Sequence, residues 1–258
     1  LKMKTRLESP VQYELPIGEE LVPMNDLIGK YIVLTWQQEI HCIGCGRKTK
    51  KSFSQGFCYP CFISAPETSE CILRPELCQA HKAVARDMDW AKKHCLQEHY
   101  VYLAISSGVK VGVTRSSQIP TRWIDQGAWQ AIILAKTPNR YTAGLIEVAL
   151  KQHISDRTQW QRMLKNELID GVDLEDKKQE MLHLLDDELK QYESDENEII
   201  EINYPVNSYP IKVKSLGFDK LNTICGKLWG IKGQYLMFDD GSVLNIRKHT
   251  GYSLELEI

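Results

Sequence analysis

Short runs of apolar and β-branched residues alternate along the chain with longer amphipathic stretches. Such runs predict strands, and they occur at residues 31–36, 100–105, 109–114, 235–238 and 243–246. In the run 109–114 every second residue is valine, so one face of that strand is apolar. The last two runs flank Asp240-Gly241, a pair that favours a type I′ turn, and together they predict a hairpin.

Helical periodicity accounts for three further stretches. Apolar residues three and four positions apart predict helices at residues 120–126, 142–153 and 173–192. The third helix is rich in acidic residues and has an apolar face. The polar residues 193–198 that follow it predict a hinge or a disordered link.

The order of these stretches predicts an α+β protein. We expect five parts: an N-terminal β segment (1–40), a zinc-binding Cys/His-rich module (41–99), a small α/β domain (100–166), an acidic amphipathic helix with a linker (167–198) and a C-terminal β domain (199–258). The strands of the first and last parts are expected to pack together.

Composition is that of a globular protein, with 43% hydrophobic and 26% charged residues and a formal net charge of −2. The apolar runs are far shorter than the roughly 20 residues of a membrane span. The N-terminal residues lack the apolar stretch of a signal peptide. We therefore expect a cytoplasmic protein without membrane contact, whose eight cysteines are metal ligands or buried residues and not a disulfide framework.

Two cysteine pairs with the spacing of a zinc ribbon provide the clearest chemical signal. Cys42 and Cys45 form one C-x-x-C pair, and Cys58 and Cys61 form the next. Each pair can direct two thiolates to one ion from a tight turn, and four thiolates satisfy tetrahedral Zn²⁺. Because four protein ligands leave no open position, the pattern predicts a structural zinc site.

A less regular group of cysteines and histidines follows the ribbon. This group predicts a possible second structural zinc site, whose ligands would be Cys71, Cys78, His81 and Cys95. The alternative is that Cys95 is a buried apolar residue and that the histidine lies on a helix surface.

Charge is unevenly distributed in spite of the small net value. The loop between the two cysteine pairs contains Arg47, Lys48, Lys50 and Lys51 and no acid. Basic residues outnumber acids from 110 to 166, whereas acids dominate from 167 to 201. A local basic surface of this kind predicts phosphate contacts with a nucleic acid. The acidic helix either binds a protein partner or is a solvated face.

Residues 100–150 resemble a GIY-YIG domain, a small α/β fold known from homing and excision-repair nucleases. Tyr102 matches the tyrosine of the first motif, and Lys110-Val111-Gly112 stands where the second motif has Tyr-Ile-Gly. Arg122 and Glu147 fall where that family has its catalytic arginine and its metal-binding glutamate. The whole chain is similar to an uncharacterised bacterial family that places Cys-rich zinc elements before a GIY-YIG-like domain.

The resemblance implies a catalytic group of Tyr102, Lys110, Arg122 and Glu147, with Mg²⁺ or Mn²⁺ at the glutamate. Lys110 departs from the family pattern, because a protonated lysine cannot accept a proton but can contact phosphate. We therefore expect a protein that binds RNA or DNA through Lys110, Arg115, Arg122 and the ribbon-loop cations. A metal-dependent endonuclease and a protein-interaction scaffold are the alternatives.

Overall fold

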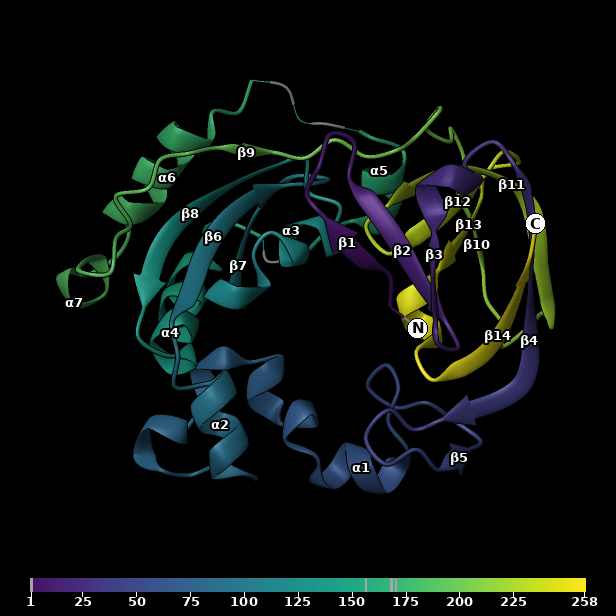
Figure 1. Cartoon of the computed structure of the whole chain (residues 1–258). Coiled ribbons are helices and arrows are strands. Elements are labelled where there is room, and N and C mark those ends of the chain that lie inside the picture. Colours follow the sequence, from purple (N-terminus) through teal and green to yellow (C-terminus); the bar gives the residue numbers. More distant parts are fainter. Residues whose placement is uncertain (1, 156, 168, 170) are drawn as a thin grey trace.

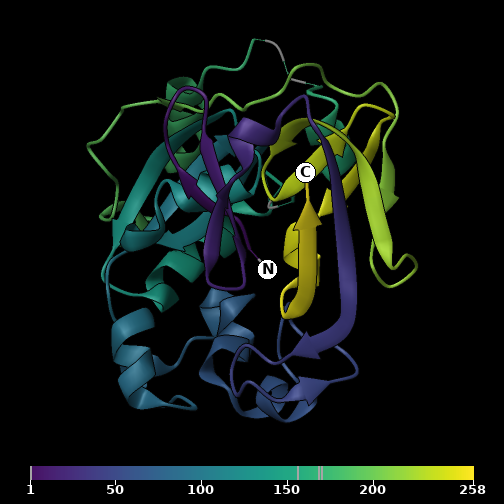
Figure 2. The same cartoon turned by 45° about the vertical axis from the view of Figure 1, so that its right-hand side comes forward.

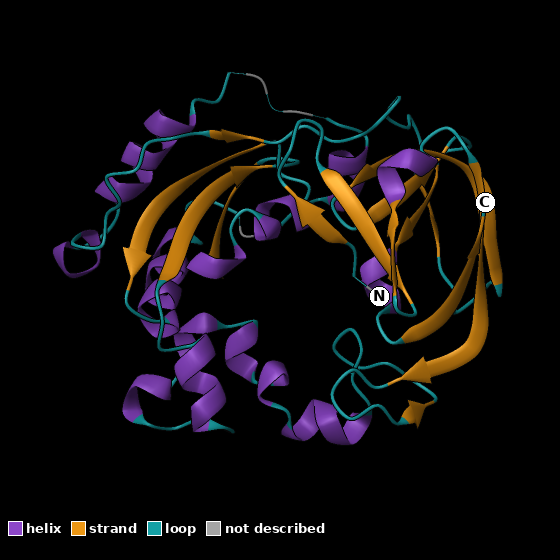
Figure 3. Cartoon of the chain, viewed as in Figure 1, coloured by secondary structure: helices purple, strands orange, loops and turns teal. Residues whose placement is uncertain are grey.

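The computed structural model describes residues 2–155, 157–167, 169 and 171–258, which form a mixed α/β protein with three sheets (Figure 1). The smallest sheet is antiparallel and contains β1 (Lys4–Arg6), β2 (Gln12–Ile17) and β3 (Glu20–Pro23). It lies between the two larger sheets, and a cysteine-rich segment joins those two on the opposite side of the molecule (Figure 3).

The largest sheet has seven strands and curves into a half-barrel (Figure 1). Its order is β10-β13-β12-β11-β4-β14, with β5 paired to β4. The strands are β4 (Tyr31–His41), β5 (Lys48–Thr49), β10 (Lys214–Leu216), β11 (Thr223–Lys232), β12 (Tyr235–Phe238), β13 (Ser242–Asn245) and β14 (Tyr252–Glu257). Because β4 lies between β11 and β14, both ends of the chain contribute to one sheet.

Three strand predictions in this sheet are confirmed. β4 begins at Tyr31 as expected and continues to His41. β12 and β13 form the predicted hairpin, in which Gly241 has a φ of +80° and Asp240 Oδ1 accepts a hydrogen bond from Ser242 N at 2.8 Å. That φ strains any residue with a side chain, which explains the glycine.

The four-stranded sheet is antiparallel, with the order β7-β6-β8-β9. Its strands are β6 (His99–Ile105), β7 (Val109–Arg115), β8 (Gln130–Thr137) and β9 (Ile200–Glu201). β6 and β7 confirm the strands predicted at 100–105 and 109–114. Alternation does not reveal β8, because its central residues are buried on both faces of the sheet.

Helices occupy the connections of the four-stranded sheet. α3 (Thr121–Asp125) confirms the helix predicted at 120–126. α4 (Arg140–Leu150) begins earlier than the predicted 142–153, because Asn139 caps it by accepting a hydrogen bond from Thr142 N at 2.9 Å. It also ends earlier, since residues 151–153 form a turn. α5 (Trp160–Leu164) follows, and 3₁₀ turns occupy Met24–Leu27, Ser116–Gln118 and Ile246–His249.

The acidic stretch predicted as one helix forms two, α6 (Leu174–His183) and α7 (Asp187–Lys190). The break allows Leu185 to enter the core on the outer face of the four-stranded sheet. Asp186 then caps α7 by accepting a hydrogen bond from Leu189 N at 2.9 Å. Burial of one leucine and a new cap therefore override the continuous helical pattern.

The polar residues 193–198, expected as a hinge or disordered link, are attached to α6. Lys178 is fully buried, and its Nζ donates hydrogen bonds to Ser194 O at 2.6 Å and Glu196 O at 2.8 Å. Asn197 Oδ1 accepts a third at 2.8 Å. A buried ammonium group must be fully hydrogen-bonded, so this lysine fixes the segment that follows the acidic helices.

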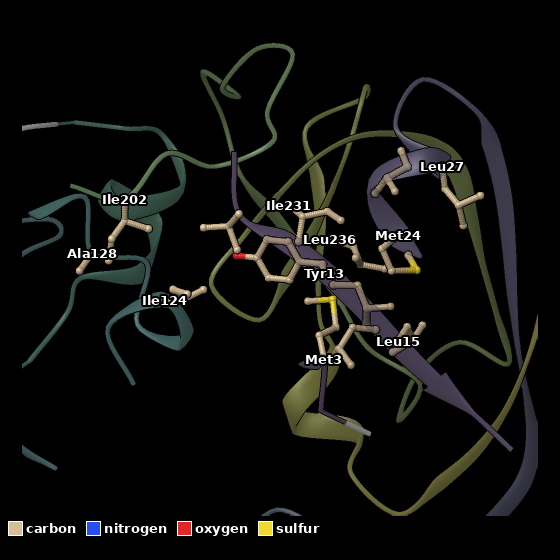
Figure 4. Packing of buried hydrophobic residues seen from close by; sticks show 14 of the residues in the cluster. Met3, Tyr13, Leu15, Met24, Leu27, Ile124, Ala128, Ile202, Ile231 and Leu236 are labelled. Carbon is tan, nitrogen blue, oxygen red and sulfur yellow. The ribbon is translucent and has the colours of Figure 1, made fainter. Parts of the chain in front are cut away.

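One buried apolar cluster fills the space between the two large sheets (Figure 4). Met3 and Tyr13 pack there beside Ile231 and Leu236 of the half-barrel (Figure 4). The cluster continues to Trp123 in α3, so the N-terminal segment unites the two sheets. A second cluster covers the other face of the four-stranded sheet, beneath α4 and α6.

The cysteine-rich segment runs from the end of β4 to the start of β6, below both sheets in Figure 2. Its helices are α1 (Tyr59–Ser64) and α2 (Met88–His94), and its 3₁₀ turns are Pro66–Thr68, Glu70–Ile72, Pro75–Leu77 and Ala80–Lys82. Its two small buried clusters consist largely of cysteines. So little apolar burial predicts that bound metal supplies much of its stability.

Candidate metal centres and a cationic pocket

The four cysteines of the predicted zinc ribbon converge. The Sγ atoms of Cys42, Cys45, Cys58 and Cys61 all lie within 4.8 Å of one another, and those of Cys45 and Cys58 are 3.8 Å apart. Two thiolates bound to one tetrahedral zinc at about 2.3 Å are themselves about 3.8 Å apart. These four residues, the first cysteine group, therefore have the dimensions of a four-thiolate zinc site.

Local backbone geometry brings these sulfurs together. Cys42 directly follows β4, and Gly46 closes the next turn with a φ of +72° and a hydrogen bond from its N to Cys42 O at 2.8 Å. Cys58 immediately precedes α1, and Pro60 suits the first turn of that helix because no intrahelical acceptor is needed there. The two C-x-x-C pairs thus sit on a turn and a helix start.

The sulfurs of the first group cannot all be ionised at low cost without a cation. Burial alone would raise the pKa of the Cys42 thiol, but backbone N–H groups, that of Cys58 foremost, lower it to about 6. Contacts with the sulfurs of Cys45 and Cys58 raise the pKa of Cys61 to about 12. A divalent ion would relieve this conflict by neutralising thiolate charge.

Cys71, Cys78 and Cys95 form a second cysteine group, whose Sγ atoms also lie within 4.8 Å of one another. They come from two successive 3₁₀ turns and from the C-terminal end of α2. Cys78 and Cys95 are buried. A hydrogen bond from the Cys71 thiol lowers the pKa of Cys78 to about 2, which prepares this sulfur to bind a cation as thiolate.

His81, the remaining member of the predicted second set, lies apart from these sulfurs. Its ring stacks on Tyr141, with the ring centroids 4.3 Å apart and an interplanar angle of 28°. Within the described part of the chain, no histidine or carboxylate joins the three sulfurs as a ligand. Both cysteine groups could hold a metal ion such as zinc, the first with four protein ligands and the second with three.

Arg140 attaches the second cysteine group to α4. Its Nη1 donates to Cys71 O at 3.2 Å, and its Nη2 donates to His94 O at 3.1 Å. Its backbone N donates to Cys95 O at 2.9 Å. The orientation of this guanidinium group therefore depends on the fold of the cysteine-rich segment.

A cavity of about 160 Å³ lies where β7, α3 and α4 meet that segment. Ile72 and Pro75 form one wall. Its polar lining, here called the cationic pocket, consists of His99, Thr114, Arg115, Gln118, Arg122 and Arg140. No aspartate or glutamate of the described residues lines it.

Several polar atoms of the cationic pocket lack hydrogen-bond partners within the described structure. Three of them are buried without a partner: Nε of Arg122, Nε of Arg140 and Nε2 of His99. Burial, assisted by repulsion from Arg140, lowers the pKa of Arg115. An anion with several acceptor oxygens would satisfy the guanidinium donors and reduce their mutual repulsion.

His99 contributes a different hydrogen-bonding group. Burial lowers its pKa to about 4, so the ring is neutral at pH 7. Its Nδ1 lies 2.7 Å from Gln97 O, which can only accept, so Nδ1 carries the proton and Nε2 has a free lone pair. This atom can accept a hydrogen bond from a hydroxyl group or a protonated phosphate.

Of the residues expected from the GIY-YIG resemblance, Arg122 lines the cationic pocket, whereas Lys110 lines a separate cavity together with Gln126 and Thr158. Tyr102 and Gly112 are cross-strand partners in β6 and β7. Tyr102 Oη donates to Gln126 Oε1 at 3.0 Å, and Lys110 Nζ donates to the same oxygen. Lys110 Nζ also donates to Thr158 Oγ1 at 2.8 Å and is almost fully buried. The structure therefore connects Tyr102 and Lys110 through one amide oxygen.

The charges of Arg122 and Glu147 both influence the Tyr102 hydroxyl group. Burial raises the pKa of Tyr102; Arg122 opposes this through its charge and a hydrogen bond, and the charge of Glu147 adds to the increase. Glu147 is mostly buried, and its carboxylate lies 3.4 Å from Lys151 Nζ. Tyr102 thus shares a hydrogen-bond acceptor with Lys110 and is influenced by the charges of Arg122 and Glu147, while Arg122 also belongs to the cationic pocket.

The ribbon-loop cations are not part of this arrangement. Arg47, Lys48, Lys50 and Lys51 are exposed, and none of them lines the cationic pocket. Lys48 is paired with Glu39 at 2.5 Å. Any contact these residues make with a ligand would be separate from the pocket.

Three residues of the candidate site were not predicted from the sequence: Arg140, His99 and Gln126. Only Arg140 carries a recognisable signal. It occupies the first turn of α4, where the positive end of the helix dipole disfavours a cation. Such a residue usually has a tertiary reason to be there, and here the reason is the pair of carbonyl groups of the cysteine-rich segment.

Within the described ranges, none of the helices has the length and apolar character needed to cross a membrane. No curated protein and no solved structure gives a significant match to the chain. A family model described as "Protein of unknown function (DUF2797)" matches residues 29–254, from the turn before β4 into β14. This match covers the half-barrel, both cysteine groups and the cationic pocket, and the chain therefore belongs to the DUF2797 family.

Proposed function

We propose that this protein is a zinc-containing nucleic-acid-binding protein that holds phosphate in the cationic pocket. The observation that carries the proposal is the convergence of Arg115, Arg122 and Arg140 on one cavity whose described lining contains no carboxylate. A volume of about 160 Å³ suits a single phosphate group, since pockets for whole drug-sized ligands start near 300 Å³. Guanidinium groups are well matched to phosphate because they donate two parallel hydrogen bonds.

Zinc has an indirect role in this proposal. The second cysteine group supports Ile72 and Pro75 in the pocket wall and accepts hydrogen bonds from Arg140 through backbone carbonyls. A metal ion bound there would stabilise the wall and the orientation of the guanidinium group. The metal would thus act on phosphate binding through structure and not through contact with the ligand.

Binding can be tested by fluorescence anisotropy with single-stranded RNA and DNA oligonucleotides over a range of salt concentrations. Arg115→Gln should weaken binding and reduce the slope of log K against log[salt] by about 0.7, the value expected for one lost phosphate contact on a single strand. Lys30→Gln, which removes an exposed charge outside the pocket, is the matched control. Equal affinities and slopes for wild type and Arg115→Gln would exclude the pocket as the phosphate site.

A second candidate function, metal-dependent phosphodiester cleavage, is supported by the proximity of Tyr102, Arg122 and Glu147. Glu147 would hold Mg²⁺ or Mn²⁺, and Arg122 would stabilise charge on the scissile phosphate. The resemblance of residues 100–150 to a GIY-YIG domain would then include the nuclease activity. Cleavage that requires Mg²⁺ or Mn²⁺ and disappears in Glu147→Gln, with zinc content unchanged, would establish this function.

The two candidates and a protein scaffold predict different outcomes in the same experiment. Salt-dependent binding without cleavage supports the phosphate-binding proposal. Absence of both would favour a scaffold in which the acidic helices α6 and α7 contact a protein partner. RNA and DNA should be compared directly, because the free lone pair of His99 could accept a hydrogen bond from a ribose hydroxyl group.

A further inference from the structure

The second cysteine group supplies one ligand fewer than tetrahedral zinc requires. Zinc in structural sites has four protein ligands, whereas three protein ligands leave one position for an exchangeable group. Side chains of the same segment that could supply a fourth ligand have other contacts: the His81 ring stacks on Tyr141, and Asp87 caps α2 by accepting from Trp90 N at 2.9 Å. Glu70, which also lines the adjoining cavity, is paired with Arg74 at 3.3 Å. The fourth position is therefore not filled by a described side chain.

A cavity of about 300 Å³ adjoins this group, and Cys71, Cys78 and Cys95 all line it. Much of the remaining lining is apolar and includes Leu77, Trp90 and Ala91. The cavity is separate from the cationic pocket and has the size of a small-molecule site. An ion held by the three sulfurs would therefore lie at the wall of a largely apolar cavity, which the charged residues Glu70, Arg86 and Asp87 also line.

We propose that zinc bound by Cys71, Cys78 and Cys95 has an exchangeable fourth position that takes a small aliphatic thiol from this cavity. Thiolate is the soft ligand that zinc favours, and the apolar lining suits the alkyl part of the thiol. In the binding step a Zn–S bond forms, a Zn–water bond breaks, and the thiol proton leaves to solvent. The site thus resembles a ligand-binding metal centre, in contrast to the closed first group.

Charge on the protein favours this exchange. Four thiolates on Zn²⁺ carry a net charge of −2, which needs compensation in a partly buried site. The Arg140 guanidinium group donates to Cys71 O at 3.2 Å, and the backbone N of Arg140 donates to Cys95 O at 2.9 Å, so a positive charge lies beside the second cysteine group. It would stabilise the negative charge that the added thiolate brings. This proposal does not depend on nucleic-acid binding.

The experiment uses the full chain loaded with Co²⁺, whose ligand-field absorption reports the number of coordinated thiolates. Titration with 2-mercaptoethanol should produce a saturable shift from three-thiolate to four-thiolate absorption, with one thiol bound per protein. 1-Propanol, similar in size but without a soft donor, should produce no shift. The first group already has four thiolates and should not respond.

Three variants make the result decisive. Cys78→Ser should abolish the response. His81→Ala should respond as wild type does. If wild type does not respond and His81→Ala does, then His81 rotates to close the site, and the proposal is overturned.

Cys45→Ser, at an exposed position, creates a three-thiolate first cysteine group and should about double the thiol-dependent change. If neither wild type nor Cys45→Ser responds, the absorption assay cannot detect thiol binding. The second measurement is then ¹¹³Cd NMR of the Cd²⁺-loaded protein. An unchanged spectrum of both cadmium sites on addition of the thiol would also overturn the proposal.

Discussion

Gly112 illustrates how one residue can determine the position of a functional side chain. A Cβ atom at this position would lie 2.6 Å from Tyr102 Oη and 2.7 Å from Tyr102 Cζ. Tyr102 is fully buried against Trp123, with ring centroids 6.0 Å apart, and cannot move away easily. The glycine therefore leaves the space in which the tyrosine ring crosses the neighbouring strand.

Gly112→Ala should destabilise the protein by about 1–3 kcal/mol, the usual cost of overpacking a core. The free energy of unfolding from urea denaturation is the measurement. Gly108→Ala is the matched control, since its Cβ would meet Ile169 Cδ1 at an ordinary 3.5 Å. Equal stability of the two variants would show that Tyr102 can relocate at little cost.

Lys232 is a second residue whose environment has a measurable consequence. It is fully buried, its Nζ donates to Asn166 Oδ1 at 2.8 Å, and the rings of Tyr204 and Tyr209 lie 5.3 and 5.1 Å from it. Burial lowers its pKa from 10.5 to about 8. The unfolded chain therefore binds more protons than the folded chain between these two values, and the free energy of unfolding rises with pH in that window.

The stability advantage of Lys232→Met over wild type should fall by about 2.5 kcal/mol between about pH 7 and about pH 10. The reason is that the cost of the buried ammonium group is present below the folded pKa and disappears above the unfolded pKa. Urea denaturation at several pH values measures the difference. Lys220→Met, at an exposed position, should show a pH dependence close to that of wild type. A constant difference for Lys232→Met would mean that this amine is not titrating in the folded state.

At the level of elements, α4 connects the four-stranded sheet to the cysteine-rich segment. Its Ala143, Ile146 and Leu150 lie in the cluster beneath the sheet, while Gly144 allows the backbone of the turn Pro75–Leu77 to approach. A Cβ on Gly144 would lie 2.2 Å from Glu76 N. Because that neighbour is backbone, no side-chain rotation can relieve the clash.

Gly144→Ala should therefore separate the Pro75–Leu77 turn from α4 and disturb Cys78 at the end of that turn. We expect a loss of more than 1 kcal/mol in stability and a decrease in metal bound at the second cysteine group, while the first group keeps its ion. Metal content after dialysis and urea denaturation measure both effects. Val148→Ala, on the exposed side of the same helix, should change neither.

At the level of the whole molecule, two different kinds of core hold the chain together. The apolar cluster shared by the half-barrel, the N-terminal sheet and α3 is extensive and needs no metal. The cysteine-rich segment has only small clusters, yet it joins β4 to β6 and supplies a wall of the cationic pocket. Metal and phosphate binding should therefore be coupled through this segment.

Removal of metal by a chelator should lower oligonucleotide affinity without unfolding the half-barrel. Hydrogen exchange measured by mass spectrometry should show increased exchange in residues 42–98 and preserved protection in β4, β11 and β14, which are paired over most of their length. Affinity should return when zinc is restored. Unchanged exchange in the cysteine-rich segment would mean that its fold does not depend on the metal.

Local patterns in the sequence determine the elements and ligands that depend on near neighbours. The C-x-x-C spacing determines the first cysteine group, because each pair reaches one ion from a single turn. The alternating valines of β7 and the Asp-Gly hairpin follow from the same short-range geometry. The break between α6 and α7 does not, because it depends on the burial of Leu185 in a distant cluster.

Only the tertiary structure decides how distant segments meet. Arg115, Arg122 and Arg140 come from β7, α3 and α4, and their convergence depends on the packing of α4 against the cysteine-rich segment. The stacking of His81 on Tyr141 and the placement of β4 between C-terminal strands likewise depend on contacts between parts of the chain that are far apart in sequence. Residue spacing therefore predicted the first cysteine group in full and the second without its correct membership, because His81 was included. Long-range packing created the cationic pocket, since no local pattern encodes which surfaces bury each other.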